Sequence, residues 1–244
     1  MAKQSTADDI RKYALSLGTD IYGVASAEEY KRRFPEKPSP MRFIEDAKSI
    51  IVIGLSFSTS TMGSVLSPEL AALEERKEEA MTNSGPPLGA ERYFLGEENN
   101  MLIRETSFAA YQIAKKLEKE SYDAFYMPPF KFDPRFKTAP FYITPAMYLA
   151  GLGTMGLNCC ILTPEYGPNV LADVIITNKE MPAGEPRNED LCQSCRSCVK
   201  SCPVDAIDGK GWKNVHLCAS YGCCGVCLAV CPTARSSAAE RGQV

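Results

Sequence analysis

Two long apolar runs dominate the hydrophobic pattern of the chain. Residues 49–56 read Ser-Ile-Ile-Val-Ile-Gly-Leu-Ser, and residues 170–177 read Val-Leu-Ala-Asp-Val-Ile-Ile-Thr. Continuous β-branched runs of this length are typical of strands that are covered on both faces. Shorter strands are predicted at residues 21–25 and 123–128, and a strand-like segment at residues 159–163. The sequence therefore predicts a buried sheet.

Helical spacing of apolar residues predicts a helix at the start of the chain and a long one near its middle. Thr6 and Asp9 resemble a capping box, with Asp in place of the usual Glu. Apolar residues follow at helical spacing, and Gly18 can end this helix. Residues 97–120 carry an apolar stripe that predicts one long helix.

Three further segments complete the element predictions. Residues 144–150 are predicted to be helical, with Pro145 suitably placed in the first turn. Residues 68–81 form a candidate helix whose charged run favours a solvated face. Residues 32–40 hold three prolines and are predicted to be a loop.

Composition narrows the class of protein. The 244 residues carry a net charge of −3, with a sequence pI near 5.4, which disfavours broad nucleic-acid binding. No apolar run approaches the roughly 20 residues that span a bilayer, and the polar start of the chain is unlike a signal peptide. Eleven cysteines in such a chain fit a reducing compartment where they hold metal, so we expect a cytoplasmic protein.

The cysteines near the end of the chain carry the strongest chemical signal. The first group follows the bacterial ferredoxin run C-x2-C-x2-C-x3-C-P, and a second, altered copy follows it. In this pattern the fourth cysteine of each run ligates the other cluster. We therefore expect one [4Fe-4S] cluster on Cys192, Cys195, Cys198 and Cys231, and a second on Cys202, Cys224 and Cys227.

The second cluster needs one more ligand. A regular copy would place a cysteine at position 221, where the chain has Tyr221. Cys218 is the favoured substitute. Cys223 is the alternative, disfavoured because it adjoins Cys224. Together with Cys159 and Cys160, Cys223 is otherwise a spare thiol, for which packing is the simplest role.

Two other uses of these cysteines are disfavoured. A disulfide framework suits small secreted chains, and the sequence shows no signal peptide. Zinc would need four thiolates at each site, and eight cysteines in this spacing are unusual for zinc.

A glycine-rich turn precedes the cysteine runs. Gly151, Gly153 and Gly156 superficially fit the dinucleotide-binding fingerprint, but a predicted helix precedes them and a strand follows, which is the reverse of the required context. The glycines allow the backbone to approach a large ligand closely. A tight connection between helix and strand, without any ligand, is the competing interpretation.

Taken with the cysteine runs, residues 150–158, 162–167 and 174–177 resemble the family of epoxyqueuosine reductases and reductive dehalogenases. The resemblance implies an α+β fold in which residues 1–180 form a nitroreductase-like core that binds base-off cobalamin. Residues 181–244 would form a ferredoxin-like domain with two [4Fe-4S] clusters. The family's cysteine order also assigns Cys218 to the second cluster.

The resemblance also implies a cofactor site and a function. The corrinoid would be lined by Gly151, Leu152, Gly153, Thr154, Met155, Gly156, Asn158, Leu162, Thr163 and Pro164. Electrons from a reduced ferredoxin or flavodoxin would pass through both clusters to cobalt, and then to a small-molecule or corrinoid-linked substrate. The alternative is an electron-transfer or corrinoid-activating iron–sulfur protein without a substrate of its own; a flavin in the same pocket is a further alternative.

The chain departs from the family pattern where a proton donor is expected. Lys137 stands where the tRNA-modifying members carry a carboxylate, so a tRNA substrate is a candidate but is disfavoured. Dehalogenases use a tyrosine with a nearby cation. Tyr142 is therefore our candidate donor, with Lys137 as the cation and Tyr148 as the alternative tyrosine. The substrate is left unassigned.

Overall fold

The computed structural model describes residues 4–66, 90–127 and 140–234. Contacts divide the chain into two compact units that interleave along the sequence. The first unit comprises Met1–Ser56, Leu102–Thr154 and Val170–Glu189. The second comprises Phe57–Met101, Met155–Asn169 and Asp190–Val244. The boundary expected near residue 180 stays a prediction, as does the candidate helix at residues 68–81, which lies outside the described residues.

A four-stranded antiparallel sheet forms the centre of the first unit. Its order is β1 (Ile21–Ser26), β2 (Ser49–Ser56), β6 (Val170–Thr177) and β3 (Ala124–Met127). The two long apolar runs are the two central strands, and residues 50–53 have no solvent exposure. The prediction of a sheet covered on both faces is therefore confirmed for these strands.

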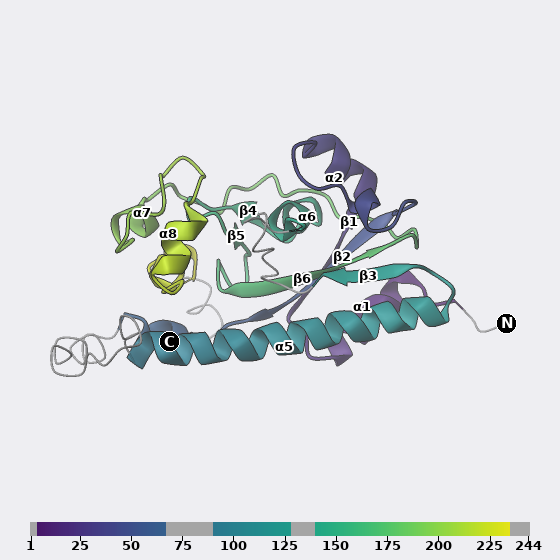
Figure 1. The fold of residues 1–244 in the computed structure, drawn as a ribbon, viewed down its shortest axis with the longest axis horizontal. Coiled ribbons are helices and arrows are strands. Elements are labelled where there is room, and N and C mark those ends of the chain that lie inside the picture. Colours follow the sequence, from purple (N-terminus) through teal and green to yellow (C-terminus); the bar gives the residue numbers. More distant parts are fainter. Residues whose placement is uncertain (1–3, 67–89, 128–139, 235–244) are drawn as a thin grey trace. The chain divides into compact units, whose positions relative to one another are not determined.

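Helices α1 (Ala7–Ser16) and α5 (Ala90–Lys119) belong to one face of this sheet (Figure 1). The capping box predicted at Thr6 and Asp9 is present, and both of its hydrogen bonds form. The buried side chains of this layer include Ile10, Ala14, Ile51, Ile53, Ile113, Leu117 and Ile175. Burial of this apolar stripe explains why the long helix forms where its periodicity predicts it.

Helix α6 (Ile143–Leu149) packs against β1, β2 and β6 and contacts α2 (Ala27–Arg33). Helix α2 is missing from the predicted elements. Its cap is Ser26, whose side chain accepts a hydrogen bond from the backbone N–H of Glu29 at 3.2 Å. The predicted loop at residues 32–40 is thus wrong at its start, which is helical, and at Pro40, which opens the 3-10 turn Pro40–Arg42.

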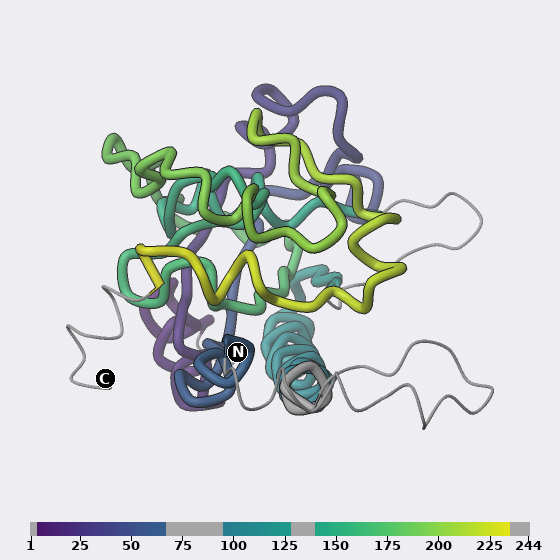
Figure 2. The backbone as a smooth tube through the Cα atoms, turned by 90° about the vertical axis from the view of Figure 1, so that its left-hand side faces the viewer, coloured from purple at the N-terminus to yellow at the C-terminus, as the bar shows by residue number. Residues whose placement is uncertain are grey.

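The second unit is built from short elements. These are α3 (Thr59–Ser64), β5 (Ile161–Leu162), α7 (Ser197–Lys200), α8 (Val215–Ser220) and α9 (Val226–Ala229), and β5 pairs with β4 (Thr154–Met155). Figure 2 shows residues 190–234 as loops joined by brief helical turns. A small core of Met62, Val65, Leu95 and Ala229 supports it.

The strand predicted at residues 159–163 is only partly correct. Pairing is confined to β5, and Cys159 has a left-handed φ of 63° that no regular strand tolerates. Among the helices of the described ranges, none is both long enough and apolar enough to cross a bilayer.

Candidate iron–sulfur centres

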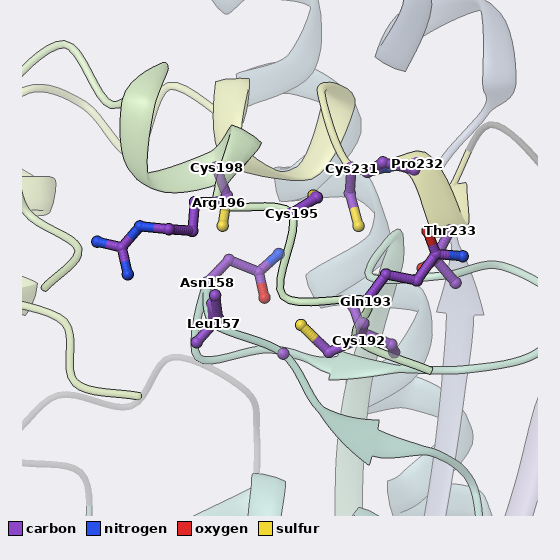
Figure 3. Close-up of a pocket in the computed structure, with 12 residues that line it drawn as sticks. Leu157, Asn158, Cys192, Gln193, Cys195, Arg196, Cys198, Cys231, Pro232 and Thr233 are labelled. Carbon is purple, nitrogen blue, oxygen red and sulfur yellow. The ribbon is translucent and has the colours of Figure 1, made fainter. Parts of the chain in front are cut away.

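Four of the predicted ligands line one pocket of the second unit. Cys192, Cys195 and Cys198 of the first cysteine run share it with Cys231 of the second (Figure 3). Burial raises the pKa of the Cys198 thiol, and the nearby thiols of Cys231, Cys192 and Cys195 act in the same direction. The crossed ligand set predicted for the first cluster therefore lies together.

Local backbone geometry positions these thiols. Arg196 adopts a left-handed φ of 60° and starts α7, which carries Cys198 into the pocket. Cys195 lies beside Ser197, with Sγ and Oγ 3.5 Å apart, and this hydrogen bond lowers the pKa of Cys195. On the far side of the pocket, Thr233 Oγ1 donates to the Leu191 carbonyl at 3.0 Å. This bond ties the end of the second run to the beginning of the first.

The glycine-rich turn supplies a wall of the same pocket. Gly156, Asn158 and Leu162 all line it. Asn158 is buried; its Nδ2 donates to the Cys227 carbonyl at 3.4 Å, and its Oδ1 accepts from the Cys160 N–H at 3.1 Å. A Cβ atom at Gly156 would lie 2.6 Å from Asn158 Oδ1, so only glycine fits there. Three residues predicted to bind the corrinoid thus border the first cluster site.

Of the four cysteines predicted to bind the second cluster, the contacts bring three close together, namely Cys218, Cys224 and Cys227. Burial, with smaller contributions from the nearby Cys160, Cys218 and Cys224, raises the pKa of Cys227 to about 12. Cys218 also shares a hydrogen bond with Cys223, which raises the pKa of Cys218 and lowers that of Cys223. Cys218 and Cys223, the two candidates for the fourth ligand of the second cluster, therefore lie next to each other. The Cys202 thiol accepts a hydrogen bond from the Ala206 N–H at 3.2 Å, within its own turn.

The donor sets fit clusters better than single ions. Among the described His, Cys, Asp and Glu residues, no three converge closely enough to hold one metal ion. In a [4Fe-4S] cluster, four iron atoms occupy alternate corners of a cube, and each iron atom binds one cysteine thiolate. The pocket of Cys192, Cys195, Cys198 and Cys231 meets that requirement in both ligand type and ligand number.

The remaining residues predicted to bind cobalamin divide between the two units. Gly151 has a φ of 72°, and a Cβ atom there would overlap the Glu185 carbonyl oxygen. Thr163 is buried in a turn, where its Oγ1 donates to the Gly167 carbonyl at 3.2 Å. Met155 is 46% exposed. Because packing of the chain itself accounts for the glycines at 151 and 156, their presence is no independent sign of a corrinoid.

The predicted proton donors lie in the first unit or outside the described residues. Tyr142 begins α6, and its carbonyl accepts a hydrogen bond from the Tyr30 hydroxyl at 2.9 Å. The ammonium of Lys37 lies 4.7 Å from the centre of its ring. Lys137 lies outside the described residues. The cation placed at Tyr142 by the described structure is thus Lys37, which the sequence reasoning did not select.

Two further polar residues of interest, Asp173 and Lys213, are not among those that the sequence analysis identified. Asp173 is fully buried within β6, and Lys213 lies half-buried beside the thiols of Cys160, Cys227 and Cys218. Neither stands in a recognisable motif. The polar residue inside an otherwise apolar run at 170–177 was the one available signal for Asp173.

Comparison with known proteins confirms the resemblance inferred from the motifs. A family model described as a 4Fe-4S binding domain matches residues 185–208. Epoxyqueuosine reductase of Bacillus anthracis is 26% identical over 236 residues, covering 87% of this chain and 55% of the relative. The chain thus spans about half the length of that curated relative.

Solved structures share the fold. A crystal structure of epoxyqueuosine reductase with an epoxyqueuosine-modified tRNA-Tyr stem loop has a TM-score of 0.59 at 21% identity, covering 94% of this chain and 65% of that one. A reductive dehalogenase whose structure suggests a mechanism for B12-dependent dehalogenation has a TM-score of 0.56 at 19% identity, covering 88% and 28%. The chain therefore has a mixed α and β fold like that of these enzymes, with a ferredoxin-like cluster region.

Proposed function

We propose that this protein is a cytoplasmic, cobalamin-dependent iron–sulfur reductase that passes electrons through two [4Fe-4S] clusters to a substrate. The observation that carries the proposal is the pocket in which Cys192, Cys195, Cys198 and Cys231 meet the glycine-rich turn. A ligand set drawn from both cysteine runs is the arrangement that a two-cluster ferredoxin domain requires.

We assign four cysteines of the second unit to each cluster. Cys192, Cys195, Cys198 and Cys231 would hold the first cluster, and Cys202, Cys218, Cys224 and Cys227 the second. Burial and neighbouring thiols raise the pKa of Cys198 and Cys227 in the free chain. These cysteines would bind iron as thiolates and would therefore lose their protons when a cluster is inserted. Bound clusters would supply one-electron transfer, and the protein would fix their positions and surroundings.

A nitroreductase-like, cobalamin-binding core is the second part of the proposal. Its support is the resemblance of residues 150–158 and 162–167 to the family motif and the fold shared with a B12-dependent dehalogenase. Gly156, Asn158 and Leu162 border the first cluster pocket, so a corrinoid held by this stretch would adjoin that cluster. Bound cobalamin would supply low-valent cobalt for the reduction. The chain would hold it mainly through backbone groups of residues 151–164.

The substrate is proposed only as a class. A small molecule or a corrinoid-linked substrate, with reduced ferredoxin or flavodoxin as donor, agrees with Lys137 replacing the carboxylate of the tRNA-modifying members. The fold shared with an epoxyqueuosine reductase in complex with a tRNA stem loop keeps tRNA as a second candidate.

Anaerobic spectroscopy tests the proposal. The purified protein is reconstituted with iron and sulfide, cobalamin is added, and the visible spectrum is recorded after gel filtration. We expect about eight iron atoms per chain and a bound, base-off cobalamin spectrum. Clusters without cobalamin binding would favour the alternative of an electron-transfer protein, and a yellow flavin released on denaturation would favour a flavoprotein.

A further inference from the structure

A single lysine of the loop between the two cysteine runs reaches the cluster region. Burial opposes the charge of Lys213, but the negative charges of Cys160, Cys227, Cys218 and Cys159 in their thiolate forms outweigh it and raise the lysine pKa overall. Two of these four thiols, Cys218 and Cys227, are predicted ligands of the second cluster. The ammonium group therefore lies within electrostatic range of that site.

The loop holds Lys213 by backbone contacts on both sides. Lys213 pairs with Ile207 in an isolated antiparallel bridge, and the Asn214 N–H donates to the Ala206 carbonyl at 2.8 Å. Asp208 Oδ1 closes the loop by accepting from the N–H groups of Lys210 at 2.7 Å and Trp212 at 3.0 Å. The residues beside this bridge contact two predicted ligands of the second cluster: the Ala206 N–H donates to Cys202 Sγ at 3.2 Å, and the Cys218 N–H donates to the Asn214 carbonyl at 3.0 Å.

Cys160 lies near one predicted ligand of each cluster. Burial raises its thiol pKa, and it is within electrostatic range of Cys218 of the second set and Cys231 of the first. The backbone N–H of Cys160 is held by Asn158, which also reaches the Cys227 carbonyl. Lys213 is thus near Cys160 and the second ligand set, whereas Cys160 is near members of both sets.

We propose that Lys213 is a positioning residue that raises the reduction potential of the second cluster. Reduction adds one electron to the cluster and one negative charge to its surroundings, with no bond formed or broken and no proton required. A fixed cation nearby stabilises that added charge. The inference rests on the proposed two-cluster domain but not on cobalamin or on any substrate.

The test measures cluster potentials in the full-length reconstituted protein. Lys213→Gln removes the charge, and Lys213→Arg keeps it. Lys210→Gln is the matched control, because it removes a cation from the same loop at an exposed position. Each protein is titrated anaerobically with dithionite, the reductant, and the reduced clusters are followed by electron paramagnetic resonance.

For Lys213→Gln we expect one of the two midpoint potentials to fall, with a reduction equilibrium weakened by about tenfold, or ~59 mV for a one-electron couple. The other potential, both potentials of Lys210→Gln and those of Lys213→Arg should stay near wild type. Unchanged potentials in Lys213→Gln, or equal shifts in Lys213→Gln and Lys210→Gln, would overturn the inference.

Two further outcomes keep the inference distinct from the proposed function. If the wild-type protein holds only one cluster, the two-cluster proposal itself fails. If Lys213→Gln loses its second cluster, Lys213→Arg should restore it. Failure of Lys213→Arg to do so would show that the shape of the lysine, not its charge, is required, and would count against the inference.

Discussion

Asp173 is the residue whose environment conflicts most with its chemistry. It is fully buried, and it faces Ile53 across the β2–β6 ladder. Its Oδ1 accepts from the Val174 N–H at 2.6 Å, whereas Oδ2 has no partner in the described part of the chain. Burial raises the pKa of Asp173 to about 8. The carboxyl group is therefore held in its neutral form well above the usual range.

This burial makes stability depend on pH in a defined direction. The folded pKa lies above the ordinary value of 3.8, so the folded state binds more protons between the two values. Stability is consequently lost as pH rises from about 4 to about 8. We expect the stability of Asp173→Asn relative to wild type to grow by ~2–4 kcal/mol between about pH 5 and about pH 8. Anaerobic denaturation at several pH values measures this difference.

The control for that experiment is Asp8→Asn, which removes an exposed carboxylate from the first turn of α1. Its stability relative to wild type should change little over the same range. A constant difference between Asp173→Asn and wild type would show that Asp173 ionises in the folded protein as it does in the unfolded chain.

Tyr142 is the candidate proton donor from the sequence, and Tyr148 in the adjoining helix α6 provides a matched comparison. If the reconstituted protein reduces a small-molecule substrate, Tyr142→Phe should lower its turnover by ~100-fold, since loss of a general acid costs about that much or more. Tyr148→Phe should retain most of the activity. Cluster content and cobalamin binding should be unchanged in both, and equal losses in the two variants would remove Tyr142 from its proposed role.

At the scale of elements, the turn after α6 depends on glycine for packing. Gly151 has a positive φ, and a side chain there would meet the Glu185 backbone. Gly151→Ala should therefore destabilise the protein by ~2–4 kcal/mol. In contrast, a Cβ atom at Gly96 in α5 would have no atom within 4 Å among its described neighbours. Gly96→Ala should therefore stabilise the folded protein by ~0.5–1 kcal/mol. Chemical denaturation of both variants checks this contrast, and a neutral Gly151→Ala would show that the turn can relax.

How far the elements can be predicted depends on their length and composition. The bounds of β2 and β6 follow from their apolar runs, because a central strand needs continuous burial. Helix α2 was missed because its seven residues are mostly charged and prolines follow closely. Its Ser26 cap and its order of acidic then basic residues were the available signals.

In the candidate site, too, some residues can be predicted from the sequence and others cannot. Cysteine spacing predicts the ligand set of the first pocket, because cluster geometry dictates that spacing. Neither Lys213 nor Lys37 could be found in this way. The tertiary fold brings Lys213 close to the cysteines and Lys37 close to the Tyr142 ring. The local sequence around a single lysine does not predict such a placement.

At the scale of the molecule, the proposed crossed ligation predicts how iron is lost. Cys231→Ser should lower iron content from about eight to about four atoms per chain, even though Cys192, Cys195 and Cys198 are intact. Cys159→Ser, which alters a thiol outside both ligand sets, should keep full iron content. Iron analysis and paramagnetic resonance check the result. Retention of both clusters in Cys231→Ser would contradict the crossed arrangement.

The pocket shared by Cys231 with Cys192, Cys195 and Cys198 has a consequence for biosynthesis. During translation, the first cysteine run leaves the ribosome before Cys231 does. If these four thiols hold the first cluster as proposed, that cluster can be completed only after the second run has emerged. A chain interrupted between the two runs would then lack the fourth ligand of its first cluster.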